Sequence, residues 1–253
     1  MRDFTFKTYE KLLSGIRDSG YAFQTFEEFI TSPAPRVVVL RHDSDIWPGN
    51  DLKMALLENR YGVRATYYFR IPYTFNIRII RKVRELGHEI GYHYENLADA
   101  GGDYEKAIAD FSRNLSLIRE ICPVRTIAMH GRPLSKWDSR TLWDRYNMAD
   151  YGIIAEPYKS VDYQTVLYLT DTGSRWDGGR VSIRDTVVSG IDAPSVKTTF
   201  HLIRAFEQGK MPDMIIINAH AARWNDNPAV WIYRYFLQNA KNTAKYFLKF
   251  YRR

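Results

Sequence analysis

The sequence has a single cysteine, and it lacks long apolar runs, internal repeats and linkers rich in glycine and serine. Cys122 has no second cysteine with which to form a disulfide or a zinc pair, so we interpret it as a small buried apolar residue. No segment holds about 18 successive apolar residues, and the first residues lack the apolar run of a secretory signal. These absences exclude a disulfide scaffold and predict a cytoplasmic protein without a membrane-spanning helix.

The composition that remains is that of an ordinary globular protein. The 253 residues are 45% hydrophobic and 26% charged, which excludes a disordered chain and suits one α/β domain. We expect a single domain over 1–253, with an N-terminal helical extension at 1–35 and a basic C-terminal helix at 227–253.

The net charge of +7 is concentrated at the C-terminal end of the chain. Six of the 36 basic residues and none of the acidic ones follow Asp226, so the rest of the chain carries only +1. Nucleic-acid binding needs basic residues spread along a face that can follow phosphates. We therefore expect no nucleic-acid partner.

A regular alternation of strand-like and helical stretches begins after Pro35. Short apolar runs typical of buried strands occur at 37–40, 65–69, 89–92, 126–129, 152–155, 166–169 and 214–217. Helical spacing separates most of these runs, and such alternation predicts a parallel sheet or an irregular (β/α) barrel. Active sites in these folds collect at the C-terminal ends of the strands.

Side chains that can hold a metal or move protons follow these strand ends. Two carboxylates and four of the six histidines lie there: Asp43, Asp45, His42, His93, His130 and His220. A metal-dependent hydrolase needs imidazoles and carboxylates around one ion, a carboxylate that takes a proton from water, and an acid for the leaving group. One such histidine alone is more often structural, as we interpret His88 and His201, but four beside an Asp-x-Asp predict one pocket.

Four segments read in order carry a resemblance to a known family: 37–45 (VVVLRHDSD), 87–93 (GHEIGYH), 129–133 (MHGRP) and 216–220 (IINAH). They resemble the motifs of the polysaccharide deacetylases, the NodB-homology family that is also called carbohydrate esterase family 4. The resemblance covers about residues 36–222 and implies an irregular (β/α) barrel of the polysaccharide deacetylase type. It also implies metal-dependent hydrolysis of an N-acetyl or similar acyl group on a sugar.

The resemblance implies a role for each matching residue. Asp43 is similar to the general base of the family and Asp45 to a metal-ligating aspartate, although Ser44 separates two residues that are adjacent in the family. His220 resembles the histidine that protonates the departing amine. The Arg-His-Asp-x-Asp form of the first motif resembles members that act in bacterial surface-polysaccharide and O-antigen biosynthesis.

The metal site departs from the family pattern at one position. The family has two metal-ligating histidines four residues apart; His93 matches the first, but Leu97 stands in place of the second. His130 or Glu95 could supply the missing ligand, and we favour His130 because it ends a neighbouring predicted strand. The implied cofactor is a divalent metal, with zinc favoured.

The remaining motif matches concern the substrate. Arg132, beside Pro133, is similar to the arginine that shapes the family's pocket, and Asp171 with Trp176 is similar to its acidic motif. We assign these three, Arg132, Asp171 and Trp176, to substrate binding. Five aromatic residues near the motifs could stack on sugar rings or pack the core: Trp47, Tyr92, Tyr94, Trp176 and Trp224.

We expect a saccharide substrate, linked to a nucleotide or to a lipid. The spacing after Asn227 favours a terminal helix packed on the core with a solvated basic face. The alternative is peripheral contact with an anionic membrane, which would place the protein at the inner membrane surface. Two functional alternatives stay open: a non-catalytic saccharide-binding or assembly protein on the same scaffold, and another amide or phosphate hydrolase.

Overall fold

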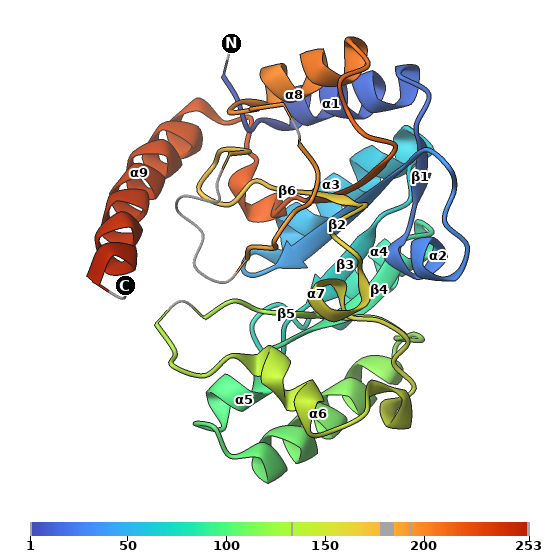
Figure 1. Ribbon diagram of the computed structural model, residues 1–253, viewed down its shortest axis with the longest axis vertical. Helices are drawn as coiled ribbons and strands as arrows, with labels where there is room; N and C mark the ends of the chain where they lie inside the picture. The colour runs from blue at the N-terminus through green and yellow to red at the C-terminus, as the bar shows by residue number, and fades with distance from the viewer. Residues whose placement is uncertain (1, 133, 178–184, 193, 252–253) are drawn as a thin grey trace.

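Seven parallel strands form the centre of the molecule, which we describe from a computed structural model (Figure 1). The structure describes residues 2–132, 134–177, 185–192 and 194–251, with the backbone alone from 244 onward. The strands are β1 (Ala22–Gln24), β2 (Val37–Ser44), β3 (Thr66–Phe69), β4 (Glu89–Tyr94), β5 (Ile127–Met129), β6 (Leu167–Thr170) and β7 (Met214–Asn218). Their order is β5-β4-β3-β2-β7-β6, and β1 also pairs with β2.

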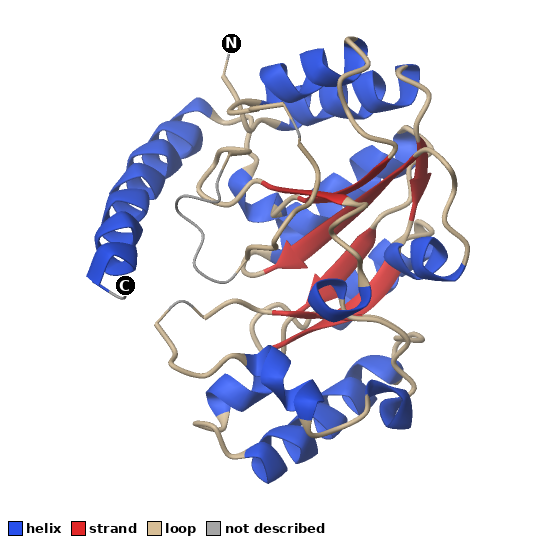
Figure 2. Ribbon diagram, viewed as in Figure 1, coloured by secondary structure: helices blue, strands red, loops and turns tan. Residues whose placement is uncertain are grey.

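Helices surround this sheet (Figure 2). The α-helices are α1 (Phe6–Asp18), α2 (Phe26–Thr31), α3 (Pro48–Arg60), α4 (Ile77–Glu85), α5 (Asn96–Asp99), α6 (Tyr104–Arg119), α7 (Pro157–Ser160), α8 (Thr199–Glu207) and α9 (Pro228–Tyr251). Short 3-10 helices are η1 (Ser139–Asp144), η2 (Met148–Tyr151) and η4 (Ala221–Arg223). The predicted fold class, an α/β protein with an irregular barrel of parallel strands, is confirmed. The barrel is open, because the described strands β5 and β6 do not pair with each other.

Strand β2 runs through the middle of the sheet and is buried along its whole length. Its first residues, 37–40, are all apolar, as expected for a parallel strand that is covered on both faces. Its last residues, 41–44, are polar and equally buried. Buried polar groups need hydrogen-bond partners, so this end of β2 organises the polar groups around it.

The N-terminal residues differ from the predicted helical extension. Strand β1 interrupts the helical stretch and pairs with β2, with Phe23 opposite Val38. Helix α2 then starts at a capping box in which Thr25 and Glu28 bond to each other's backbone N–H. Helix α1 packs against α8 (Figure 1). Residues 2–35 therefore complete the central sheet and its cover.

The strand expected at 152–155 is not formed. Gly152 has a left-handed φ of 65° and ends η2, and only Ala155 makes an isolated bridge, to Thr126. Ile153 and Ala155 are buried all the same. The apolar run thus marks a buried connection, and burial alone does not distinguish such a segment from a strand.

Helix α9 projects along one side of the molecule (Figure 1). Its first turns are anchored by Trp231, whose Nε1 donates to the carbonyl of Asp3 at 2.6 Å. Beyond this anchor its large apolar side chains are exposed, among them Ile232, Tyr233, Tyr235 and Phe236. The favoured expectation of a helix packed on the core is wrong for these residues. The side chains of Lys245 and Lys249, and residues 252–253, lie outside the described part.

Candidate functional site

The residues predicted to form a pocket come from the C-terminal ends of several strands. Asp43 lies near the end of β2 and Asp45 just beyond it, and His93 lies near the end of β4. His130 follows β5 and His220 follows β7. Because the strands are parallel, these ends meet at one edge of the sheet.

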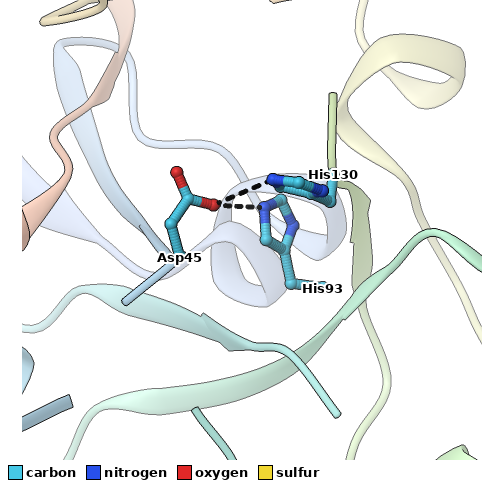
Figure 3. Close-up of side chains that lie close together, drawn as sticks. All are labelled: Asp45, His93 and His130. Carbon is cyan, nitrogen blue, oxygen red and sulfur yellow. Dashed lines mark ion pairs between the residues drawn. The ribbon is translucent and has the colours of Figure 1, made fainter. Parts of the chain in front are cut away.

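Asp45, His93 and His130 form a cluster with the geometry of a metal site (Figure 3). The Oδ1 atom of Asp45 lies 3.5 Å from Nε2 of His93 and 3.4 Å from Nε2 of His130. Ligand atoms about 2.0–2.1 Å from a tetrahedral zinc ion are about 3.3–3.4 Å apart. The Asp45 oxygen is thus spaced from each nitrogen as two ligands of one such ion would be, and all three ligand atoms lie within 4.8 Å of one another.

Hydrogen bonds fix the orientation of both imidazole rings. Nδ1 of His93 lies 2.9 Å from the carbonyl oxygen of Ala128, and Nδ1 of His130 lies 2.9 Å from Oε2 of Glu95. Since a carbonyl and a carboxylate oxygen only accept, we assign the proton of each neutral ring to Nδ1. Each Nε2 then directs a free lone pair at Asp45.

The Oδ1 atom of Asp45 is buried and has no hydrogen-bond partner. An unpartnered buried oxygen is costly, and the two nitrogen lone pairs beside it cannot donate to it while the rings are neutral. As protonated rings, His93, His220 and His130 would outweigh the effect of burial and bring the pKa of Asp45 well below its usual range. A divalent cation would satisfy all three atoms, so the residues present fit a metal.

Glu95, the alternative third ligand, acts on the histidine instead. It forms an ion pair with Arg70, whose Nε donates at 3.0 Å, and accepts from His130 through its other oxygen. Burial alone would raise the pKa of Glu95, but His130 and Arg70 lower it to about 2. Leu97, at the position of the family's second histidine, is fully buried in the core.

Asp43, predicted to be the base, is held between two residues that the sequence analysis missed. Arg41 donates to both of its oxygens, from Nε at 3.1 Å and from Nη2 at 2.7 Å. Asn218 Nδ2 donates to Oδ2 at 2.9 Å. Three of about four lone pairs of the carboxylate are thus occupied, and Oδ2 lies 3.9 Å from Nε2 of His93.

These contacts keep Asp43 ionised. Burial alone would raise its pKa, but Arg41, His93 and His220 together bring the pKa well below its usual range. The carboxylate therefore stays ionised at neutral pH, and the one lone pair that these donors leave free is on Oδ1. Arg41 precedes Asp43 by two residues, and Asn218 precedes His220 by two. A strand repeats every two residues, so this spacing was the available signal.

His220, predicted to be the acid, is oriented by Asp171. Its Nδ1 lies 2.6 Å from Oδ1 of Asp171, and its backbone N–H donates to Oδ2 at 3.0 Å. Burial and Arg223 act to lower the pKa of His220, but Asp171 outweighs them and the pKa is raised. Its Nε2 faces the site, 4.0 Å from Oδ2 of Asp45.

The residues assigned to substrate binding have three different positions. Asp171 is fully buried and supports His220 rather than facing a substrate. Arg132 stands beside the site, half-exposed, with an ion pair to Asp99 and its Nε 3.6 Å from Glu95. Pro133 lies outside the described residues.

Trp176 is a correction, because it lies in the core. It is 3% exposed, its ring stacks on Phe4, and its Nε1 donates to Oγ1 of Thr199 at 3.0 Å. Its apolar area is thus already buried and not available to a sugar. Of the five aromatic residues near the motifs only Trp47 is exposed; Tyr92, Tyr94 and Trp224 are buried as well.

His42, expected among the pocket histidines, points to the opposite side of β2. Its Nε2 lies 2.7 Å from Oε1 of Glu58, and its Nδ1 lies 2.7 Å from the carbonyl of Ala219. Tyr9 and Tyr67 also donate to Glu58, each at 2.6 Å. Alternation along the strand separates His42 from Asp43, so it is a structural residue. His88 is buried nearby, and His201 is exposed on α8.

A pocket of about 190 Å³ opens at the site and reaches α9. Its lining includes Asp45, Trp47 and His220, together with three basic residues: Arg223, Arg234 and Lys241. A larger cavity of about 900 Å³ lies against α1 and α8. It contains none of the groups described above, so we place the site at the smaller pocket.

No family model and no curated protein matches the sequence. Several solved structures are similar in fold. A family 4 carbohydrate esterase from Bacillus anthracis shares 12% identity over 92% of this chain and 86% of that one, with a TM-score of 0.45. A CE4 esterase from Streptococcus mutans shares 15% identity over 90% of each chain, with a TM-score of 0.46.

A third structure, a CE4 family pseudoenzyme from Bacillus anthracis, shares 16% identity over 85% of this chain and 66% of that one, with a TM-score of 0.40. All three belong to the family whose motifs the sequence resembles. At such identities the likeness concerns the fold alone.

Proposed function

We propose that the protein is a metal-dependent deacetylase that hydrolyses an N-acetyl or similar acyl group on a sugar. The observation that carries this proposal is the convergence of two histidine lone pairs on the unpartnered oxygen of Asp45. The resemblance of the first motif supports a place in the assembly of a bacterial surface polysaccharide.

The ligands of the metal in this proposal are Asp45, His93 and His130, and zinc suits one carboxylate with two imidazoles. Such an ion supplies Lewis acidity, which makes water a better nucleophile and an amide carbonyl a better electrophile. Glu95 and Ala128 hold the two imidazoles in the tautomer that can bind it. Because the ligand set also suits other first-row ions, the test below covers several metals.

The proton transfers are assigned to two residues on either side of this cluster. Asp43 is ionised and takes the proton of the attacking water through its remaining lone pair. His220, with its raised pKa and its Nε2 directed into the pocket, donates a proton to the departing amine nitrogen. Asp171 stabilises the protonated ring and prevents its rotation. The products are a carboxylate such as acetate and a free amino sugar.

The first experiment is elemental analysis of purified wild type, His93→Ala and His201→Ala. His201 is exposed on α8 and serves as the matched histidine control. We expect near-stoichiometric zinc or another transition metal in wild type and in the control, and loss of the metal in His93→Ala. Acetate release from N-acetylated sugars should follow the metal content. A wild type that binds no metal after incubation with zinc, cobalt or manganese would favour the non-catalytic saccharide-binding hypothesis.

A further inference from the structure

The pocket beside His220 carries more positive charge than the proposed reaction uses. Arg223, Arg234 and Lys241 line it together with one acid, Asp45, which belongs to the metal cluster. Arg223 is paired with Asp171, where its Nη1 lies 3.2 Å from Oδ1. Arg234 and Lys241 have no carboxylate partner among the described residues.

Arg234 is held in place although no acid holds it. Its guanidinium carbon lies 4.4 Å from the centre of the Trp47 ring, and Nη1 donates to the carbonyl of Ala222. A guanidinium has five N–H donors, so most of them remain available. Partial burial lowers the pKa of Arg234, yet an arginine stays charged at neutral pH.

We propose that this pocket binds a phosphoryl group carried by the saccharide, with Arg234 and Lys241 as its ligands. A sugar 1-phosphate carries about −1.5 to −2 charges at neutral pH, and each phosphoryl group of a diphosphate link is also anionic. Both match two free cations better than a single carboxylate does. Arginine also binds phosphate through two parallel hydrogen bonds. This inference rests on the proposed function, because it describes the substrate of the same site.

One pocket holds both of these cations and His220, the proposed acid. Trp47 is 53% exposed, follows Asp45 by two residues in the sequence, and carries the Arg234 guanidinium over its ring. The pocket, at about 190 Å³, is below the roughly 300 Å³ of an ordinary ligand site. It is therefore too small to enclose a whole lipid-linked or nucleotide-linked saccharide, so part of such a substrate would lie outside it.

The test compares three probes on the metal-loaded protein: N-acetylglucosamine, its 1-phosphate and its uridine diphosphate derivative. Calorimetry gives a Kd for each with wild type, Arg234→Gln, Lys241→Gln and the control Arg78→Gln, an exposed arginine of α4. We expect a phosphorylated probe to bind wild type at least about tenfold more tightly than the neutral sugar. That advantage should disappear in Arg234→Gln and Lys241→Gln and persist in the control.

Two sources of the phosphoryl group are distinguished by a further arm. Sedimentation with vesicles that contain a polyprenyl-diphosphate-linked N-acetylamino sugar, against vesicles of the unglycosylated lipid phosphate and of neutral lipid, tests a lipid-linked substrate. Preference for these vesicles identifies the lipid source, and preference for the uridine diphosphate sugar identifies the nucleotide source. Both outcomes support the phosphoryl site.

Other results overturn the inference. These are equal Kd values for neutral and phosphorylated probes, absence of binding by every phosphorylated probe at millimolar concentration, or tighter binding of an N-acetylated uronic acid. Acetate release without a phosphate preference would leave the hydrolase standing and remove this site. A phosphate preference without acetate release from any probe would do the reverse.

Discussion

Strand β2 separates two histidine–carboxylate clusters. They are built from similar groups, but the hydrogen bonding of their carboxylates differs. On one face, Glu58 accepts from His42, Tyr9 and Tyr67, and both of its oxygens are occupied. On the other face, Oδ1 of Asp45 has no hydrogen-bond partner, and two imidazole nitrogens face it. The first cluster is complete in itself, whereas the second offers three atoms that a cation could bind.

The difference arises from the second ring nitrogen of each histidine. In His42 both nitrogens face acceptors, the Ala219 carbonyl and Glu58, and this arrangement favours the protonated ring. Burial acts to lower the pKa of His42, but Glu58 raises it overall. In His93 and His130 only Nδ1 has a hydrogen-bond acceptor of its own. The two Nε2 atoms face one shared oxygen, Oδ1 of Asp45. The same residue type thus supports the fold on one face and can bind a metal on the other.

The largest effect we expect comes from Asp43→Asn, on the face of β2 beside the metal-binding cluster. A general base contributes about 10²–10⁴-fold to a rate, so acetate release should fall by at least about 100-fold. The metal content should stay that of wild type, because the change removes a base and leaves the three ligands. Asparagine keeps an oxygen that can accept from Arg41, and circular dichroism checks that the variant is folded. Loss of the metal in this variant would mean that the roles of Asp43 and Asp45 are exchanged.

Which strand ends meet could be predicted from the sequence, and which way each side chain points could be predicted only in part. The alternation of apolar runs and helices located the strands that carry His93, His130 and His220. Period-two alternation was already enough to separate His42 from Asp43 and to place Arg41 beside Asp43. By this alternation His42 faces away from the pocket, contrary to the expectation that all four histidines share it.

Other features depend on contacts between distant segments, which one sequence does not contain. Trp176 is buried because Phe4 and Thr199, far away in the chain, pack around it. The partnership of Arg70 with Glu95 joins two different strand ends. Arg234 reaches Trp47 only because α9 passes the pocket. Local spacing could not reveal these three contacts.

The next largest effect concerns the opposite face of β2, which carries the Glu58 cluster. Glu58→Gln leaves the His42 cation without a carboxylate and brings an amide N–H₂ toward groups that already donate. Breaking a buried ion pair costs about 3–5 kcal/mol, so we expect the free energy of unfolding in urea to fall by about 3 kcal/mol. The control Glu120→Gln, at an exposed position, should change it by less than about 0.5 kcal/mol. Metal content should match wild type in both variants. Metal loss in folded Glu58→Gln would show that the two faces are coupled.

A smaller effect concerns Glu95, which supports the metal-binding cluster through His130. Glu95→Gln replaces the carboxylate that fixes the tautomer of His130 but leaves all three metal ligands in place. Outer partners of this kind change metal affinity by about 10–100-fold, so competition with a chelator should show a shift of that size. His130→Ala removes a ligand and should weaken binding further. Equal affinities in wild type and His130→Ala would exclude His130 as a ligand.

The smallest effect that we expect concerns the pH dependence of stability. It is measured on chelator-treated protein as the difference in free energy of unfolding between wild type and Glu58→Gln. His42 and neighbouring groups outweigh burial and lower the pKa of Glu58 from its ordinary value of 4.5. Its contribution is therefore present above about pH 4.5 and is lost as the pH falls through the lowered folded pKa.

The pKa of His42 is raised from its ordinary 6.5, so its contribution is present below about pH 6.5 and is lost as the pH rises through the raised folded pKa. Together, these two pKa shifts predict that wild type exceeds Glu58→Gln in free energy of unfolding most strongly between about pH 4.5 and 6.5, and less on both sides. Urea titrations at a series of pH values measure it. A difference in free energy of unfolding that stays constant from pH 5 to pH 9 would show that His42 is neutral. The Glu58 cluster would then be a network of hydrogen bonds without an ion pair.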